Sequence, residues 1–191
     1  MDVAVLPTPS PTPDHPLVAK AEEVFERTSP YEGFGFRHHC QRLFHFATML
    51  MQRDGIELDR DLAYLVAMVH DLGIVSERDE GHNYLQRSRA LFHRETEGLP
   101  LPDADTTVLD ECLLYNHRLL PVPNLSPAAE CFRRAVIIEH TRGIKRYGLP
   151  RDAVAQVFAE HPRGNFDRVL LDFTWRTLRR EPLTLVRGIF F

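Results

Sequence analysis

Apolar residues recur at spacings of three and four along most of the chain, and strand-like alternation of apolar and polar residues is absent. This spacing places the apolar side chains on one face of an α-helix. Pro- and Gly-rich stretches separate the periodic segments and end each helix. We expect helices over residues 17–28, 37–53, 60–70 with Asp59 as N-cap, 84–95, 105–118, 127–147, 151–160 and 166–179. The pattern therefore predicts an all-α fold, a single bundle of about seven or eight helices.

The two ends of the chain differ from this pattern. Residues 1–16 hold five prolines, and such a segment cannot support a helical ladder. We expect a Pro-rich tail over residues 1–16, ordered only if it docks, and one helical domain over residues 17–191. The last five residues, 187–191, expose apolar side chains unless they pack against the domain or a second subunit, which suggests a homodimer.

Composition narrows the class of protein. Of 191 residues, 43% are hydrophobic and 26% are charged, which is typical of one soluble globular domain. The formal net charge of −4 gives no basic excess for binding nucleic acid.

No apolar run approaches the roughly 20 residues that span a bilayer, and the N-terminus lacks a signal peptide, so we expect a cytoplasmic protein that contacts no membrane. Three cysteines without CxxC spacing favour buried thiols over a disulfide or zinc-thiolate site.

The strongest chemical signal is the adjacent pair His70 and Asp71, at the end of a very apolar predicted helix and just before Gly73. Histidine and aspartate both bind metal ions, and a helix that ends here can present both side chains toward one point. A third ligand must come from another helix. His45 is the candidate, because apolar residues surround it in its predicted helix and a buried ring needs a partner.

The series Arg42, His45 and His70-Asp71-Leu-Gly resembles the HD superfamily of helical metal-dependent hydrolases, whose pattern is H…HD…D. The match covers approximately residues 37–180. The resemblance implies an all-helical core, phosphohydrolase-type activity on nucleotides or other phosphate esters, and His45, His70 and Asp71 as metal ligands. Three later segments fit a branch of the family that acts on small molecules: 83–90, 115–118 and 132–135.

The chain departs from the family pattern at Val136, where the resemblance calls for a metal-binding Asp. Valine has no donor atom. Glu139 and His140 lie one helical turn further along and can reach back toward the ion. Glu139 either replaces the missing ligand or keeps a role in positioning or catalysis while the ion holds three protein ligands. His117 is a further candidate, as a ligand or as the proton donor to a leaving group.

These features predict an enzyme that binds a divalent Fe, Mn, Zn or Co ion and acts on a small, anionic molecule. Hydrolysis by a metal-activated water is the first expectation, with Asp71 accepting the water's proton and Arg42 holding the anion. By resemblance Arg133 is a second substrate-binding residue, and His140 a third.

Three alternatives remain open at this stage. The histidines at 45, 70, 93 and 117 are spaced by 25, 23 and 24 residues and resemble the ordered ligands of dinuclear-iron HD-type oxygenases, with His82 competing for the place of His93. Hydration or lyase chemistry of the cyanamide-hydratase kind is a second alternative. A degenerate HD domain that binds without turnover is the third. The remaining histidines, at 15, 38, 39 and 161, are expected at the surface.

Overall fold

The computed structural model describes residues 10–77, 81–101 and 106–183. Within these ranges it contains eight α-helices and one short 3₁₀ helix, and no strand. The helices are α1 (Pro16–Thr28), α2 (Gly35–Asp54), α3 (Arg60–Val69), η1 (Leu72–Ile74), α4 (Tyr84–Thr96), α5 (Thr106–Leu114), α6 (Pro127–His140), α7 (Arg151–Glu160) and α8 (Phe166–Arg180). The predicted all-α class is confirmed.

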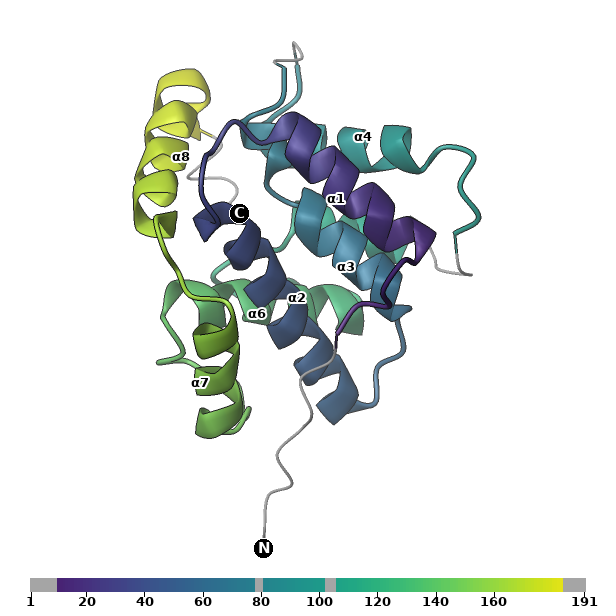
Figure 1. Ribbon diagram of the computed structural model, residues 1–191, viewed down its shortest axis with the longest axis vertical. Helices are drawn as coiled ribbons and strands as arrows, with labels where there is room; N and C mark the ends of the chain where they lie inside the picture. The colour runs from purple at the N-terminus through teal and green to yellow at the C-terminus, as the bar shows by residue number, and fades with distance from the viewer. Residues whose placement is uncertain (1–9, 78–80, 102–105, 184–191) are drawn as a thin grey trace, which may run out of the picture.

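Helix α2 is the centre of the bundle. It packs against α3, α6, α7 and α8, and α1 lies along α3 (Figure 1). From His39 to Met51 every α2 side chain except Gln41 is buried. Buried side chains therefore cover almost the whole circumference of this helix, as expected for an element enclosed on all sides.

Helix α3 carries the His-Asp pair to the middle of the molecule. Asp59 caps its start by accepting hydrogen bonds from the amides of Asp61 and Leu62, as predicted. The helix ends at Val69, His70 follows as its C-cap, and the chain turns into η1. Gly73 is required there because a Cβ atom would lie 2.0 Å from the carbonyl oxygen of Tyr84, so this turn can press closely on α4.

Two predicted helix ends are wrong. Helix α6 was expected to continue to residue 147 but ends at His140, because Arg142 and Gly143 take left-handed backbone conformations with φ of 51° and 76°. Helix α5 ends at Leu114, so His117 lies in the turn that follows rather than inside a helix. His140 is therefore the last residue of α6 and His117 lies in the turn after α5, and both line one cavity with Asp71.

The end of the Pro-rich tail docks on α3. The Thr12 amide donates a 2.7 Å hydrogen bond to Asp61 Oδ1, and Arg60 Nη2 donates to the Thr12 hydroxyl. His15 then caps α1 through its Nδ1 atom. The first nine residues of the predicted tail, and the apolar C-terminal residues 187–191, lie outside the described residues.

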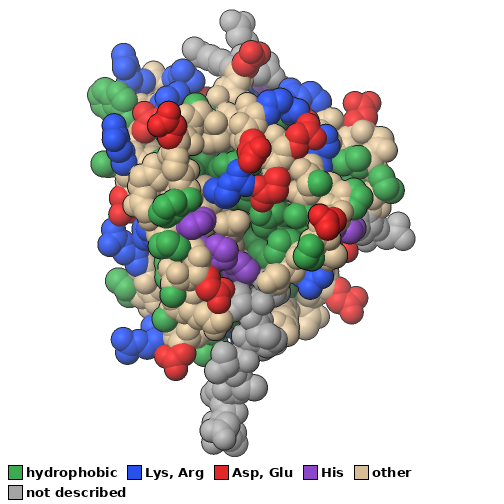
Figure 2. Space-filling view, viewed as in Figure 1, with side chains coloured by type: hydrophobic (Ala, Val, Ile, Leu, Met, Phe, Trp, Pro, Cys, Tyr) green, Lys and Arg blue, Asp and Glu red, His purple; other side chains and the backbone are tan. Residues whose placement is uncertain are grey.

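The surface is mixed in character. Figure 2 shows acidic and basic side chains interspersed over one face of the molecule, with histidine side chains gathered near its centre. Helix α8 exposes three large apolar side chains, Leu171, Trp175 and Leu178. Among the described residues no helix combines the length and the apolar character that a bilayer span requires.

Candidate metal centre

Three side chains from α2 and the end of α3 converge at a buried point. His39 Nε2 lies 3.3 Å from His70 Nε2 and 3.5 Å from Asp71 Oδ2, and His70 Nε2 lies 3.1 Å from the same carboxylate oxygen. His39 and His70 are fully buried, and Asp71 is 3% exposed. Two imidazole nitrogens and one carboxylate oxygen therefore share a space in which a metal ion can bind all three.

The atoms behind the two imidazoles fix which nitrogen carries a proton. His70 Nδ1 lies 2.7 Å from the carbonyl oxygen of Ala67, which can only accept, so Nδ1 donates. His39 Nδ1 faces the Glu139 carboxylate, with 3.2 Å to Oε2. The His70 contact places a proton on Nδ1, and both contacts leave the Nε2 atom of each ring directed at the shared space, where a metal ion would take the place of any Nε2 proton. Metal-binding histidines are commonly oriented in this way, by a carbonyl or carboxylate on the far nitrogen.

The third ligand is oriented by His117. His117 Nε2 lies 2.9 Å from Asp71 Oδ1, which leaves Oδ2 facing the two histidines. Asp71 is thus placed to bind an ion through one oxygen while the other accepts a hydrogen bond. His117 holds the carboxylate and is not itself part of the three-residue group.

The charges of the site call for a cation. Burial acts to raise the pKa of Asp71, but His70 and His117 hold it well below its usual value, so the carboxylate stays ionised. Burial acts to lower the pKa of His70, and the adjacent Asp71 carboxylate outweighs it and raises that pKa well above its usual value. A site that attracts a proton this strongly also attracts a metal ion. The residues present therefore fit a divalent ion.

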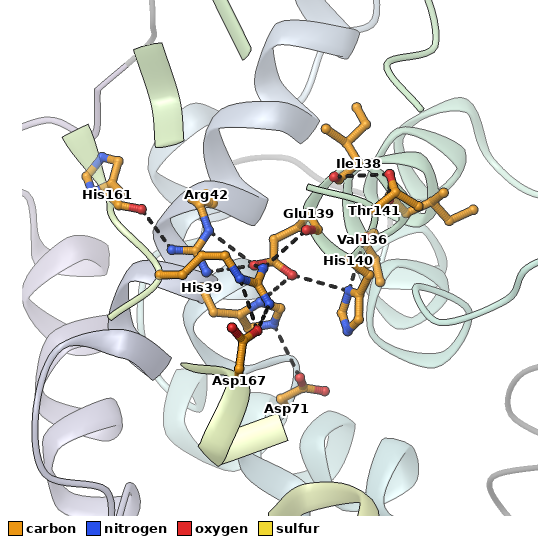
Figure 3. Close-up of polar contacts among 12 residues, drawn as sticks. His39, Arg42, Asp71, Val136, Ile138, Glu139, His140, Thr141, His161 and Asp167 are labelled. Atoms are coloured by element: carbon orange, nitrogen blue, oxygen red, sulfur yellow. Dashed lines mark hydrogen bonds and ion pairs between the residues drawn. The ribbon is translucent and has the colours of Figure 1, made fainter. Parts of the chain in front are cut away.

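Glu139 forms a second buried layer behind His39 (Figure 3). Its Oε1 atom accepts hydrogen bonds from Arg42 Nη2 at 2.6 Å and from Arg163 Nη1 at 2.6 Å. Burial acts to raise the pKa of Glu139, but His39, then His140 and Arg42, hold it well below its usual value. The two arginines fix this carboxylate behind His39, where it orients the ring. This geometry favours the positioning role for Glu139 over the role of a substitute ligand.

A cavity of about 260 Å³ opens beside Asp71. His117 and His140 line it, together with Val136 and apolar residues of α6 and α8. His140 Nδ1 lies 2.9 Å from the Val136 carbonyl oxygen, so this nitrogen donates and Nε2 keeps a lone pair. Burial lowers the pKa of His140 to about 4, with Glu139 opposing this effect and His39 and His117 adding to it, so the ring is neutral at pH 7.

The structure does not bring His45 to this cluster. His45 Nε2 lies 2.9 Å from His161 Nε2, and the two rings stack with centroids 4.7 Å apart. The place predicted for His45 is taken by His39, which was expected at the surface but is fully buried, with its ring stacked on Phe166 of α8. His39 lies three residues after Phe36 and four before Leu43, both buried, and this apolar stripe is the signal in the sequence that marks it.

The predicted substrate-binding arginines face other partners. Arg42 is fully buried against Glu139 and donates to the carbonyl oxygen of His161. Arg133 pairs with Glu130 and donates to the backbone carbonyls of residues 118 and 119. Neither arginine lines the cavity.

The two histidines that compete for one place in the dinuclear alternative, His93 and His82, also lie apart from the cluster. His93 Nε2 pairs with Asp110 at 2.6 Å, and the His93 side chain is 39% exposed. His82 is exposed. Within the described part of the chain, the three-residue group is the single set of histidine, cysteine and acidic side chains that meets the spacing of a metal site.

Neither protein-family models nor curated protein sequences match this chain. The comparisons therefore leave the resemblance to the HD superfamily as a prediction. The molecule is an all-helical domain with a buried His/Asp cluster that could hold a metal ion.

Proposed function

We propose that this chain is a metal-dependent hydrolase of the HD type, with His39, His70 and Asp71 as the protein ligands of one divalent ion. The observation that carries the proposal is the convergence of their three donor atoms, all within 4.8 Å of one another. The order of the ligands along the chain, one histidine on α2 and a His-Asp pair after α3, keeps the H…HD part of the family pattern with His39 in place of His45. Val136 supplies no fourth ligand.

A divalent ion bound here supplies positive charge that lowers the pKa of a water ligand and polarises the bond under attack. Asp71 holds the site through Oδ2 while His117 fixes its other oxygen. His140 presents the unprotonated Nε2 of a neutral ring and accepts a proton from the attacking water. The surrounding apolar side chains exclude bulk water and strengthen these interactions.

A donor set of two histidines and one carboxylate occurs in zinc hydrolases and also in mononuclear iron oxygenases. The two activities are separated by their need for oxygen. A hydrolase keeps full turnover under anaerobic conditions, whereas an oxygenase loses it.

The test is metal content measured together with turnover on a panel of esters, amides and phosphate esters. We expect about one ion per chain in protein purified without chelator, and loss of both metal and turnover in Asp71→Asn and His70→Gln. Asp61→Asn, also on α3 but directed at the tail, is the matched control and should keep both. Full metal content in Asp71→Asn would contradict the proposal, as would turnover that survives complete removal of metal.

A further inference from the structure

The cavity beside Asp71 has a lining that constrains what can enter it. Its walls carry large apolar side chains from α6 and α8, among them Val136, Ile137, Leu170 and Phe173, with Ile74 from η1. The polar groups among its lining residues are hydroxyls, two imidazoles and the Asp71 carboxylate. An apolar wall with a few fixed polar groups is typical of sites for small organic molecules.

No arginine or lysine belongs to this lining among the described residues. The two arginines behind the cluster are already paired, since Arg42 and Arg163 both donate to Glu139. Arg133 is likewise held by Glu130. A phosphate ester carries negative charge and needs charge-assisted donors in place of the water it loses. The metal ion would be its one source of such stabilisation, and the Asp71 carboxylate offsets part of that charge.

Tyr84 provides a neutral donor instead. It is 6% exposed, it lines the cavity, and its ring lies 6.1 Å from that of His117. Burial raises the pKa of Tyr84 well above its usual value, with Asp71 and Glu181 adding to this effect, so its hydroxyl stays protonated. The backbone amide of Tyr84 donates to Glu181, which holds the residue at the start of α4 with its side chain lining the cavity. The hydroxyl is therefore available to donate to a carbonyl oxygen of a bound molecule.

Building on the proposed function, we propose that the substrate is an uncharged ester or amide with a compact apolar body, and that it is not a phosphate ester. The apolar body lies against Val136, Leu170 and Phe173, and Tyr84 donates to the carbonyl oxygen, where negative charge develops during attack. The water oxygen bonds to the carbonyl carbon. The bond from that carbon to the alcohol oxygen or amine nitrogen breaks, and its electron pair leaves with that atom. One proton of the water goes to the leaving group, and the acyl product is released as a carboxylic acid.

The experiment compares two probes that share one ring and differ in charge. Benzamide is uncharged and phenylphosphonate is anionic at pH 7.5, and the binding of each to the metal-loaded chain is measured by calorimetry. We expect benzamide to bind at least about tenfold more tightly. Tyr84→Phe should weaken benzamide binding about five- to tenfold, the range for one neutral hydrogen bond, with metal content unchanged.

A pair of neighbouring residues on α8 supplies the matched control. Leu170 lines the cavity, whereas Leu171 faces outward and is 72% exposed. Leu170→Arg should reverse the preference toward phenylphosphonate, because it gives the cavity a cation. Leu171→Arg adds the same charge outside the cavity and should leave the preference unchanged.

The outcomes separate the two proposals. Tighter binding of phenylphosphonate than of benzamide to the metal-loaded wild-type chain would overturn the substrate class, as would equal binding. A wild-type chain that takes up no metal would overturn the metal-dependent hydrolase, whichever probe its cavity prefers.

Discussion

Two pairs of histidines meet along helix α2, and they differ in every feature that matters for binding a metal. His39 meets His70, and His45 meets His161, with Nε2 to Nε2 distances of 3.3 Å and 2.9 Å. The first pair has Asp71 within 3.5 Å of both rings. For the second pair, no described acidic side chain completes a metal site.

The difference lies in what stands behind the rings. Ala67 and Glu139 face the far nitrogens of His70 and His39, so both near nitrogens are directed at one another and at a carboxylate. A cation, either a proton or a metal ion, can be held between them. In the second pair one ring donates to the other, and a single hydrogen bond satisfies both near nitrogens. Whether a pair of histidines can bind a metal therefore depends on the groups that contact the two rings, and the presence of two histidines alone is not sufficient.

The largest expected effect comes from removing the Glu139 carboxylate, which lies behind His39 in the His39–His70 pair. Glu139→Gln leaves the fully buried Arg42 without its carboxylate and removes one of the two carboxylates that pair with Arg163, so the free energy of unfolding should fall by about 3–5 kcal/mol. Metal affinity should fall about 10- to 100-fold because His39 loses its orienting partner. Urea unfolding and metal titration measure the two effects.

Glu130→Gln is the control on the same helix. Glu130 is partly exposed, and its buried partner Arg133 also donates to two backbone carbonyl oxygens, so the loss of Glu130 should cost about 1 kcal/mol without changing metal affinity. A Glu139→Gln variant that matches this control in both measurements would contradict the positioning role of Glu139.

Adding an oxygen donor beside the His39–His70 pair should raise metal affinity, a change smaller than that of Glu139→Gln and opposite in sign. Val136 lines the cavity beside Asp71 and His140. Val136→Asp adds an oxygen donor there, so metal affinity should rise about tenfold or more. Val136→Asn has similar size without the charge and should give a smaller gain. Competition with a chromogenic chelator measures both, and a weakened affinity in Val136→Asp would show that position 136 does not face the ion.

Removing the second pair should change stability only slightly. His161→Asn deletes one partially exposed ring and its hydrogen bond to His45, which should lower the free energy of unfolding by about 1 kcal/mol. Metal content should equal that of the wild type. Loss of metal in this variant would remove the distinction between the two pairs.

The contribution of His161, in the His45–His161 pair, to the pH dependence of the unfolding free energy should be smaller still. Burial lowers the pKa of His161, with His38 and Arg42 adding to this effect and Glu160 opposing it. The stability of the neutral ring is therefore fully present above the unfolded pKa of about 6.5 and is lost as the pH falls below it. Wild-type unfolding free energy should decline from pH 7 to pH 5.5 more than that of His161→Gln. An equal decline would mean that His161 does not contribute.

The helices could be predicted from the sequence because apolar spacing and caps are local signals. The His70-Asp71 pair was predicted for the same reason, since both residues follow one apolar helix. The choice between His39 and His45 depends instead on how α2 lies against α3, and both histidines occupy buried positions of a helix that is enclosed on all sides.

The directions of the Arg42 and Arg133 side chains were not predicted, because each arginine pairs with a glutamate. The fold brings Glu139 to Arg42, and the local helical turn brings Glu130 to Arg133. The end of α6 depended on left-handed conformations at Arg142 and Gly143, of which only the glycine is visible in the sequence.

The most direct test compares metal stoichiometry in His39→Ala and His45→Ala. These residues lie on the same helix, both are buried, and each contacts another histidine. Elemental analysis of both variants, purified without chelator and shown to be folded by circular dichroism, should find about one ion per chain in His45→Ala and none in His39→Ala. The reverse result, metal retained in His39→Ala and lost in His45→Ala, would contradict the assignment of the metal centre to His39, His70 and Asp71.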